Sequence, residues 1–382
     1  MIATLLLSCC TPALALGDPD DLSSRTNTSP IQSSVETRTF YPLAWHNAGT
    51  TWYLNESDLS YTIQNPTTEP VLVRLTSQYP GYSHPVNTTV RVEANSTLVH
   101  DQYIRLNLPQ IREVGTTTTA AIYYRIEYQD GDTWIVEEEK TNPVTFYPMN
   151  QMVWAIEDPD GKITVYHGFI AAFVTPQSGG VMDLLAKAKE WARSDLDERY
   201  AKYGLERSLR GYSGNITSYS EAKECTALQV KAIYNALKYD YNLSYVHTPV
   251  AFGVGDMQRV NTPDESLERR NANCIEGAVL VASAIEALGM RPYIIITPDH
   301  AYVAWDTDSS GTQREALETT LINDYDFEAA KTRGNQILKE DSGRTVLYQS
   351  LFDMTISRED YNEMCVLVDI TWLRSQKILP MA

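Results

Sequence analysis

The chain has few cysteines, fewer basic than acidic residues, and no long apolar run after its first residues. Five cysteines in 382 residues do not form a disulfide framework. With 31 basic and 49 acidic residues the net charge is −18, which argues against nucleic-acid binding because that requires a basic surface. No later segment is long and apolar enough to cross a bilayer, so we expect no transmembrane span beyond a leader.

Motifs for bound metals and cofactors are also missing from the sequence. No grouping of Cys, His and carboxylate residues has the spacing of a zinc site, and neither an EF-hand nor a phosphate loop is present. We therefore expect no metal and no cofactor. The acidic residues are spread along the chain, a pattern typical of the solvated surface of a secreted or salt-adapted protein.

The first residues resemble the end of a secretory signal. Residues 1–16 contain an apolar stretch that leads to Ala13-Leu14-Ala15, an A-x-A cleavage pattern. An alternative is a weak lipobox that ends at Cys9, which would make Cys9 a lipid anchor. Residues 17–36 are polar and low in complexity, which predicts a disordered tether. We therefore expect an extracellular or cell-envelope protein.

Six glycosylation sequons support export. They are more frequent than chance would give for this Ser and Thr content, although turns rich in Asn and Thr also produce sequons without any sugar. The sequons begin at Asn27, Asn55, Asn87, Asn95, Asn215 and Asn242.

Residues 37–148 predict an all-β sandwich of immunoglobulin-like type. Short alternating or β-branched runs separated by turn residues occur at 59–64, 70–75, 87–93, 120–128 and 133–137. About seven strands at such spacing fit this sandwich, without its usual cysteine pair. Residues 149–177 contain a predicted hairpin around Asp158-Pro159-Asp160-Gly161, which either connects two domains or supplies the last strands of the sandwich.

Residues 178–382 predict a second domain of α+β class. Apolar residues at helical spacing indicate helices over about 181–204 and 219–237. Cys225 lies in the second of these helices and Cys365 in an apolar strand. The two thiols either form one bridge or are simply buried, and the sequence leaves both alternatives open.

Cys274 begins a third, strongly apolar helix. Ile275, Val279, Ala282 and later apolar residues recur at steps of three and four, Asn271 or Asn273 can cap the start, and Gly289 follows the end. Free N–H groups and the positive end of the helix dipole favour a thiolate at such a position. The residue is therefore a candidate nucleophile, with a small buried core cysteine as the alternative interpretation.

His300 and Glu318 are the residues that could activate this thiol. A β-run over 291–298 is followed by an alternating strand that begins at Asp299-His300, and Glu318 lies in a third predicted strand. Adjacent strands can place a histidine beside the helix start and a carboxylate beside the histidine, which is the arrangement of covalent acyl chemistry. A second oxyanion donor besides the Cys274 N–H is expected, and the candidates are Gln258, Tyr245 and Tyr239.

These residues resemble the signatures of the transglutaminase-like superfamily, which shares the papain-like core. The resemblance rests on Asn273-Cys274-Ile-Glu-Gly, Pro298-Asp-His300-Ala-Tyr-Val and Glu318-Thr-Thr, and it extends over roughly the second half of the chain. Glu318 stands where aspartate is commoner, and Ala272 stands where a glycine is usual. The similarity implies a transglutaminase-like (papain-like) α+β domain over 178–382 in a microbial exported protein, with Cys274, His300 and Glu318 as a catalytic triad.

The function that the resemblance implies is cysteine-dependent acyl transfer. A thioester on Cys274 would be hydrolysed in an enzyme that cleaves peptide or carboxamide bonds, with a peptide, a protein or cell-envelope material as substrate. Amine-accepting cross-linking is one alternative, and an intracellular amidase that keeps its N-terminus is another. A non-catalytic cell-surface binding or structural protein that keeps the fold is a further alternative, although such a protein would not need all three residues.

Overall fold

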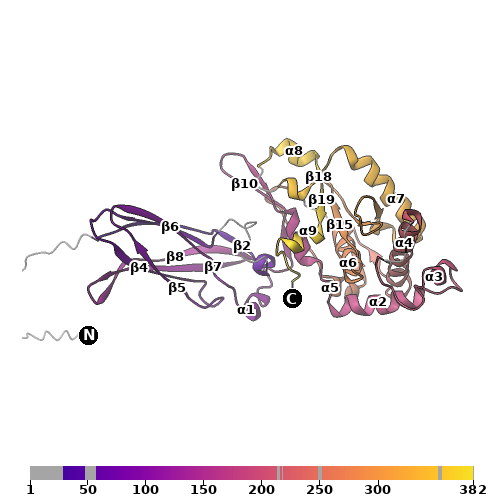
Figure 1. Ribbon diagram of the computed structural model, residues 1–382, viewed down its shortest axis with the longest axis horizontal. Helices are drawn as coiled ribbons and strands as arrows, with labels where there is room; N and C mark the ends of the chain where they lie inside the picture. The colour runs from indigo at the N-terminus through magenta and orange to yellow at the C-terminus, as the bar shows by residue number, and fades with distance from the viewer. Residues whose placement is uncertain are drawn as a thin grey trace, which may run out of the picture.

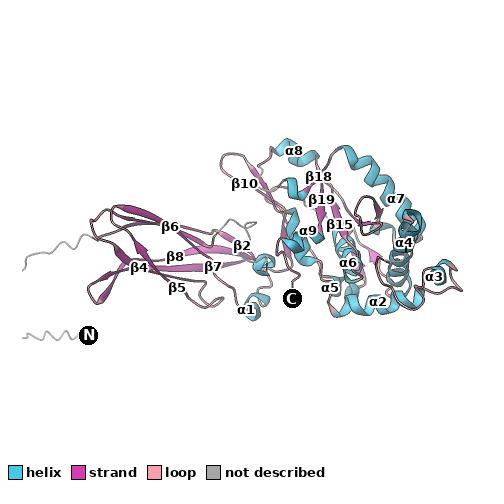
Figure 2. Ribbon diagram, in the orientation of Figure 1, coloured by secondary structure: helices cyan, strands magenta, loops and turns pink. Residues whose placement is uncertain are grey.

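The computed structural model describes residues 29–47, 57–212, 216, 218–247, 252–351 and 355–381. They form a mixed α/β structure with several sheets, and the N-terminal part is β-rich (Figures 1 and 2). The predicted leader over 1–16, the alternative lipid anchor Cys9 and three sequons (Asn27, Asn55 and Asn215) lie outside the described residues.

Two sheets make up the β-rich part. A three-stranded sheet has the order β1-β3-β6, and a five-stranded sheet has the order β2-β8-β7-β4-β5. Their strands are β1 (Gln32–Thr37), β2 (Phe40–Pro42), β3 (Leu59–Asn65), β4 (Val71–Gln78), β5 (Val86–Val92), β6 (Ser96–Gln102), β7 (Thr118–Asp130) and β8 (Thr133–Tyr147). The short elements η1 (Leu43–Asn47) and α1 (Leu108–Arg112) lie between them. All five predicted strands are confirmed.

Alternation of side chains explains why these strands pack face to face. Leu59, Tyr61 and Ile63 of β3 are buried, while the residues between them are less buried. Val73 and Leu75 of β4 belong to the same hydrophobic core. Because successive side chains point to opposite faces of a strand, each sheet presents one apolar face, and the two faces enclose the core.

The prediction of a disordered tether is wrong for residues 32–36. These residues belong to β1, which pairs antiparallel with β3 and aligns Val35 with Tyr61. The segment is polar, so its side chains gave no strand signal. Its backbone hydrogen bonds to β3 place it in the sheet without a large apolar contribution. Residues 17–28 lie outside the described part of the chain.

The predicted hairpin is confirmed, and the segment around it packs with the C-terminal part. Strand β10 (Ala155–Glu157) pairs antiparallel with β11 (Ile163–Val165). The preceding β9 (Gln151–Val153) pairs with β13 (Met257–Arg259), and Trp154 belongs to the core of the C-terminal part. These strands therefore do not extend the two N-terminal sheets.

The C-terminal part is built on a five-stranded sheet with the order β17-β16-β15-β19-β18. Its strands are β15 (Pro292–Ile296), β16 (Ala301–Asp306), β17 (Arg314–Leu317), β18 (Thr345–Leu347) and β19 (Cys365–Asp369). Strands β15 and β16 are buried at every residue, as expected when both faces of a sheet are covered. Helix α6 (Cys274–Ala287) packs on one face, and α7 (Phe327–Glu340) contributes Ile337 and Leu338 to a smaller cluster on the other.

The remaining elements surround this framework. They are η3 (His167–Phe173), α2 (Gly179–Trp191), α3 (Arg199–Lys202), α4 (Tyr219–Asn235), η4 (Ala236–Asp240), β12 (Ser244–Tyr245), α5 (Pro263–Arg269), β14 (Asn271–Ala272), η5 (Thr319–Leu321), η6 (Asp341–Gly343), η7 (Tyr348–Ser350), α8 (Arg358–Glu363) and α9 (Ile370–Ser375). Figure 1 shows α2, α4 and α5 grouped around α6.

One predicted helix is shorter than expected, and the other is confirmed. The helix expected over 181–204 ends at Trp191, and only the short α3 follows within that range. The N–H of Ser194 donates to the side chain of Glu206, and the Asp195 carboxylate accepts from Arg193. These side-chain partners compete with the helical hydrogen bonds. The helix expected over 219–237 corresponds to α4 and the π-helical turn after it.

Cys225 and Cys365 are free, buried thiols. The alternative in which they form a bridge is therefore wrong, and the alternative in which both are buried is confirmed. Burial raises the pKa of the Cys225 thiol to about 11 and that of Cys365 to about 12. Every helix in the described ranges is too short or too polar to cross a lipid bilayer.

Trp45 joins the β-rich part to the C-terminal part. Its side chain, 1% exposed, stacks on Phe169 of η3 with ring centroids 4.2 Å apart and lies 4.8 Å from the Tyr166 ring. The Trp45 ring thus makes an aromatic contact between η1 and η3, which come from different parts of the chain. Burial of such a large side chain contributes several kcal/mol.

Replacement of Trp45 by Ala should weaken this contact. We expect a loss of about 3–5 kcal/mol in the free energy of unfolding, the usual range for a buried Trp-to-Ala change, and separation of one thermal transition into two. Differential scanning calorimetry measures both effects. The matched control is Trp134→Ala on β8, whose partly exposed ring lies 4.5 Å from the Arg74 guanidinium and should cost about 1 kcal/mol. Equal losses in the two variants would contradict the role given to Trp45.

Candidate active site

Helix α6 places Cys274 at its first residue. Asn273 caps the helix: its side chain accepts from the Glu276 N–H at 3.0 Å, and the Glu276 carboxylate accepts from the Asn273 N–H at 2.9 Å. The other oxygen of Glu276 accepts from the Asn261 N–H at 2.9 Å. One buried carboxylate therefore holds both the helix start and the segment before α5, and it lies where the helix dipole favours negative charge.

The helix is buried on every side, so its start is enclosed. All residues from Cys274 to Ile285 are buried, and Cys274 itself is 1% exposed. The sulfur thus lies inside the protein, at the positive end of a helix whose first N–H groups have no intrahelical acceptor.

His300 and Glu318 form a short, largely buried pair. His300 does not lie in a strand as predicted, because β16 begins only at Ala301 and His300 lies in the turn before it. Its Nε2 is 2.7 Å from Glu318 Oε2. The Glu318 side chain is 4% exposed and that of His300 27%. A hydrogen bond from Nε2 to the carboxylate leaves Nδ1 as the ring nitrogen available to another partner.

Glu318 does not lie in a strand as predicted. Strand β17 ends at Leu317, and Glu318 caps the short η5, where its Oε1 accepts from the Thr320 N–H at 3.0 Å and the Thr320 hydroxyl at 2.7 Å. The carboxylate can satisfy these donors because the chain turns here and leaves the sheet. Thr320 thus fixes one oxygen while the other faces His300.

Interaction with Cys274 shifts the titration of His300. Burial alone would lower the pKa of His300, but its hydrogen bond with Cys274 and its pairing with Glu318 outweigh burial and raise the pKa to about 10. For Glu318 burial acts to raise the pKa, yet the His300 and Thr320 hydrogen bonds lower it below its usual range. The structure thus brings Cys274, His300 and Glu318 together, as the sequence predicts.

The three oxyanion candidates differ in where they lie. Burial raises the pKa of Tyr245 of β12, and the nearby Cys274 and Glu318 raise it further. Gln258 of β13 is 6% exposed, and its amide makes no hydrogen bond within the described residues. Tyr239 is 57% exposed and its ring lies 5.1 Å from Trp191. Of the three, Tyr245 is the residue connected to the Cys274 group.

Two supporting residues were missed in the sequence. Glu276 completes a capping box with Asn273, a pattern visible as Asn-x-x-Glu before an apolar run. Thr320 follows Glu318 by two residues, and Thr side chains often bond locally at such spacing. Within the described ranges no group of three or more His, Cys, Asp or Glu residues could hold a metal ion.

Comparisons with known proteins give little information about this arrangement. No family model and no curated protein matches the chain. Similar solved structures include a FixG-related protein from Vibrio parahaemolyticus, with 11% identity over 31% of this chain and 97% of that one and a TM-score of 0.18. Another is the Salmonella enterica SafA pilin in complex with the SafB chaperone, with 17% identity over 35% of this chain and 65% of that one and a TM-score of 0.19. Similarities of this size carry no argument about fold or function.

The pairing of His300 should make stability depend on pH. Because its folded pKa is raised to about 10, the stabilisation is complete below about pH 6.5 and is lost as pH rises through 10. We expect His300→Gln to cost about 2 kcal/mol more at pH 6 than at pH 10, less than the full shift because the ring is partly exposed. Urea unfolding at both pH values measures this difference. His84→Gln, at an exposed position, is the control, and an equal cost of His300→Gln at both pH values would contradict the pairing.

Proposed function

We propose that the chain is an exported, cysteine-dependent acyl-transfer enzyme of the transglutaminase-like superfamily. In this proposal the C-terminal part has the transglutaminase-like (papain-like) fold, and the β-rich part is an immunoglobulin-like sandwich. The observation that carries the proposal is the 2.7 Å contact between His300 and Glu318 beside Cys274 at the start of α6. A nucleophile, a base and an orienting acid in this order are the requirements of covalent acyl chemistry.

The proposed reaction is hydrolysis of a peptide or carboxamide bond in two steps. Because its pKa is raised to about 10, His300 already carries the proton of the pair near neutral pH. The Cys274 sulfur attacks the carbonyl carbon, the C–N bond breaks, and the protonated ring gives its proton to the leaving amine, so that a thioester remains. Water attacks the thioester while His300, neutral after the first step, accepts a proton from it, which breaks the C–S bond, releases a carboxylic acid and restores the sulfur beside a protonated His300 ring. Glu318 fixes the ring orientation and stabilises its positive charge throughout.

The carbonyl oxygen becomes negatively charged in both steps and needs donors. The Cys274 N–H lies in the first turn of α6 and is one donor. The Tyr245 hydroxyl is the second donor that we favour, since β12 pairs Tyr245 with Ala272, two residues before Cys274. In the structure this hydroxyl lies 3.2 Å from His247 Nδ1. Gln258 remains a candidate because its buried amide lacks a partner within the described residues.

Export and substrate class belong to the same proposal. The described sequons at Asn87, Asn95 and Asn242 are all exposed, as attachment of a glycan requires. Peptides, proteins or cell-envelope material would be the substrates met by an extracellular or envelope protein.

Burial of Cys274 favours a second candidate function. With 1% exposure, the thiol is as enclosed as a core residue. A non-catalytic surface protein that keeps this framework would bury the sulfur permanently, whereas an enzyme must expose it during turnover. Reactivity of the thiol therefore separates the two candidates.

Labelling by a peptide-like electrophile tests the nucleophile. We expect one adduct, on Cys274, in the wild-type protein, none there in Cys274→Ala, and labelling slowed about 100-fold or more in His300→Ala because the base is lost. Intact-protein and peptide mass spectrometry locate the adduct. Cys225→Ala, which removes another buried thiol, is the control and should label like wild type. Equal labelling of wild type, Cys274→Ala and His300→Ala would support the non-catalytic candidate.

The product distinguishes hydrolysis from cross-linking. When a glutamine peptide and an alkylamine are supplied together, the proposed hydrolase releases the carboxylic acid, whereas a transglutaminase forms the substituted amide. Mass spectrometry of the peptide separates the two products. Amide as the main product would replace hydrolysis by amine transfer without changing the role of Cys274.

A hydroxyl deletion tests the oxyanion donor. Tyr245→Phe should lower kcat about 10- to 1000-fold with little change in KM, because the lost bond forms in the transition state. Tyr239→Phe is the matched control at an exposed position and should leave kcat unchanged. An unchanged kcat in Tyr245→Phe would leave Gln258 as the donor to examine.

A further inference from the structure

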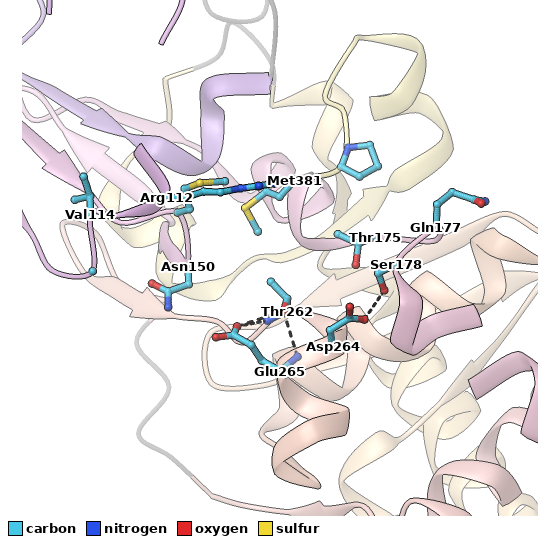
Figure 3. Close-up of a pocket in the computed structure, with 13 residues that line it drawn as sticks. Arg112, Val114, Asn150, Thr175, Gln177, Ser178, Thr262, Asp264, Glu265 and Met381 are labelled. Carbon is cyan, nitrogen blue, oxygen red and sulfur yellow. Dashed lines mark hydrogen bonds between the residues drawn. The ribbon is translucent and has the colours of Figure 1, made fainter. Parts of the chain in front are cut away.

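A cavity lies at the junction of the β-rich part and the C-terminal part of the chain. Its volume is about 700 Å³, within the range of small-ligand and peptide side-chain sites, which often lie at domain boundaries. Figure 3 shows Arg112 and Val114 of the β-rich part on one side and Thr175, Ser178 and Asp264 of the C-terminal part on the other. Cys274, His300 and Glu318 do not line it, so it is separate from the candidate active site.

The Thr175 hydroxyl in this cavity is buried without a partner. Thr175 is 7% exposed, and its Oγ1 makes no hydrogen bond among the residues that the structure describes. Figure 3 shows this oxygen directed toward the side of the cavity that carries Asp264. Because a buried hydroxyl without a partner is costly, the position calls for a ligand group that can hydrogen-bond to it.

Asp264 is an exposed residue whose carboxylate lies on the same side of the cavity as Thr175 (Figure 3). Its Oδ1 accepts from the Ser178 hydroxyl at 2.6 Å and the Gly180 N–H at 3.0 Å, and no cation of the described residues forms an ion pair with it. The neighbouring Glu265 differs, since Arg269 lies 3.4 Å and Arg259 3.8 Å from its carboxylate. The second oxygen of Asp264, Oδ2, accepts from no described residue, so the carboxylate can accept a hydrogen bond from a cationic ligand.

Apolar residues elsewhere in the lining indicate that the ligand also has an apolar part. Val114, Met149 and Met381 are apolar residues of the lining, and Val114 and Met381 are buried. An apolar stem that ends in a cation matches these walls.

We propose that this cavity binds the lysine side chain of a peptide or protein. The ammonium group lies between the Asp264 carboxylate and the Thr175 hydroxyl, and the methylene stem runs toward Met381, which Figure 3 shows nearer to them than Val114. A net charge of −18 attracts such a cationic partner over long range. The site is noncovalent and independent of the Cys274 chemistry.

Two peptides that differ only in the ammonium group test the proposal. The probes are acetyl-Ala-Lys-Ala-amide and the same peptide with norleucine in place of lysine, titrated calorimetrically into the full chain carrying Cys274→Ala, so that neither peptide is consumed. We expect the lysine peptide to bind at least about tenfold more tightly, as a charge-assisted hydrogen bond would give.

Variants locate the binding site. Asp264→Asn keeps the shape of the side chain and should remove the preference for the lysine peptide. Thr175→Val should lower the affinity for the lysine peptide about threefold. Glu268→Gln is the matched control, since it removes an exposed carboxylate from the same helix outside the cavity. Equal binding of the two peptides, an unchanged preference in Asp264→Asn, or an equal loss in Glu268→Gln would overturn the proposal. Because no turnover is measured, these outcomes are distinct from a failure of the proposed enzyme activity.

Discussion

Complete burial of helix α6 is the constraint on which the candidate site depends. Its residues are apolar around the whole circumference, so the helix is stable only with the sheet on one side and other helices on the rest. This arrangement encloses the polar start of the helix as well. Asn273 and Glu276 then become necessary, because buried N–H groups at a helix start require acceptors.

The same constraint sets the geometry of the three candidate residues. A helix packed on β15 and β16 has its start near the turn that joins these two strands, and His300 lies in that turn. Strand β17 pairs with β16, so its end brings Glu318 to the same place. Residues far apart in the sequence therefore meet because the sheet order is fixed by burial of apolar strands on both faces.

Much of this arrangement could be predicted from sequence because it follows apolar periodicity. Helix α6, strands β15 and β16, and the long strands of the β-rich part carry strong patterns. Strand β1 does not, since its place in the sheet comes from backbone pairing with β3 and not from apolar side chains. The early end of α2 at Trp191 was also missed, because it depends on contacts such as that of Ser194 with Glu206, which no local pattern reveals. The grouping of Cys274, His300 and Glu318 was predicted, but the enclosure of the sulfur depends on side chains from several elements.

The unequal exposure of the three residues has a consequence for their contact with the solvent. Cys274 and Glu318 are almost fully enclosed, whereas the imidazole of His300 keeps an open edge. Solvent therefore contacts these three residues mainly at the His300 ring. Among Cys274, His300 and Glu318, the His300 ring is the most exposed, so oxidants dissolved in the medium contact this ring more readily than the thiol.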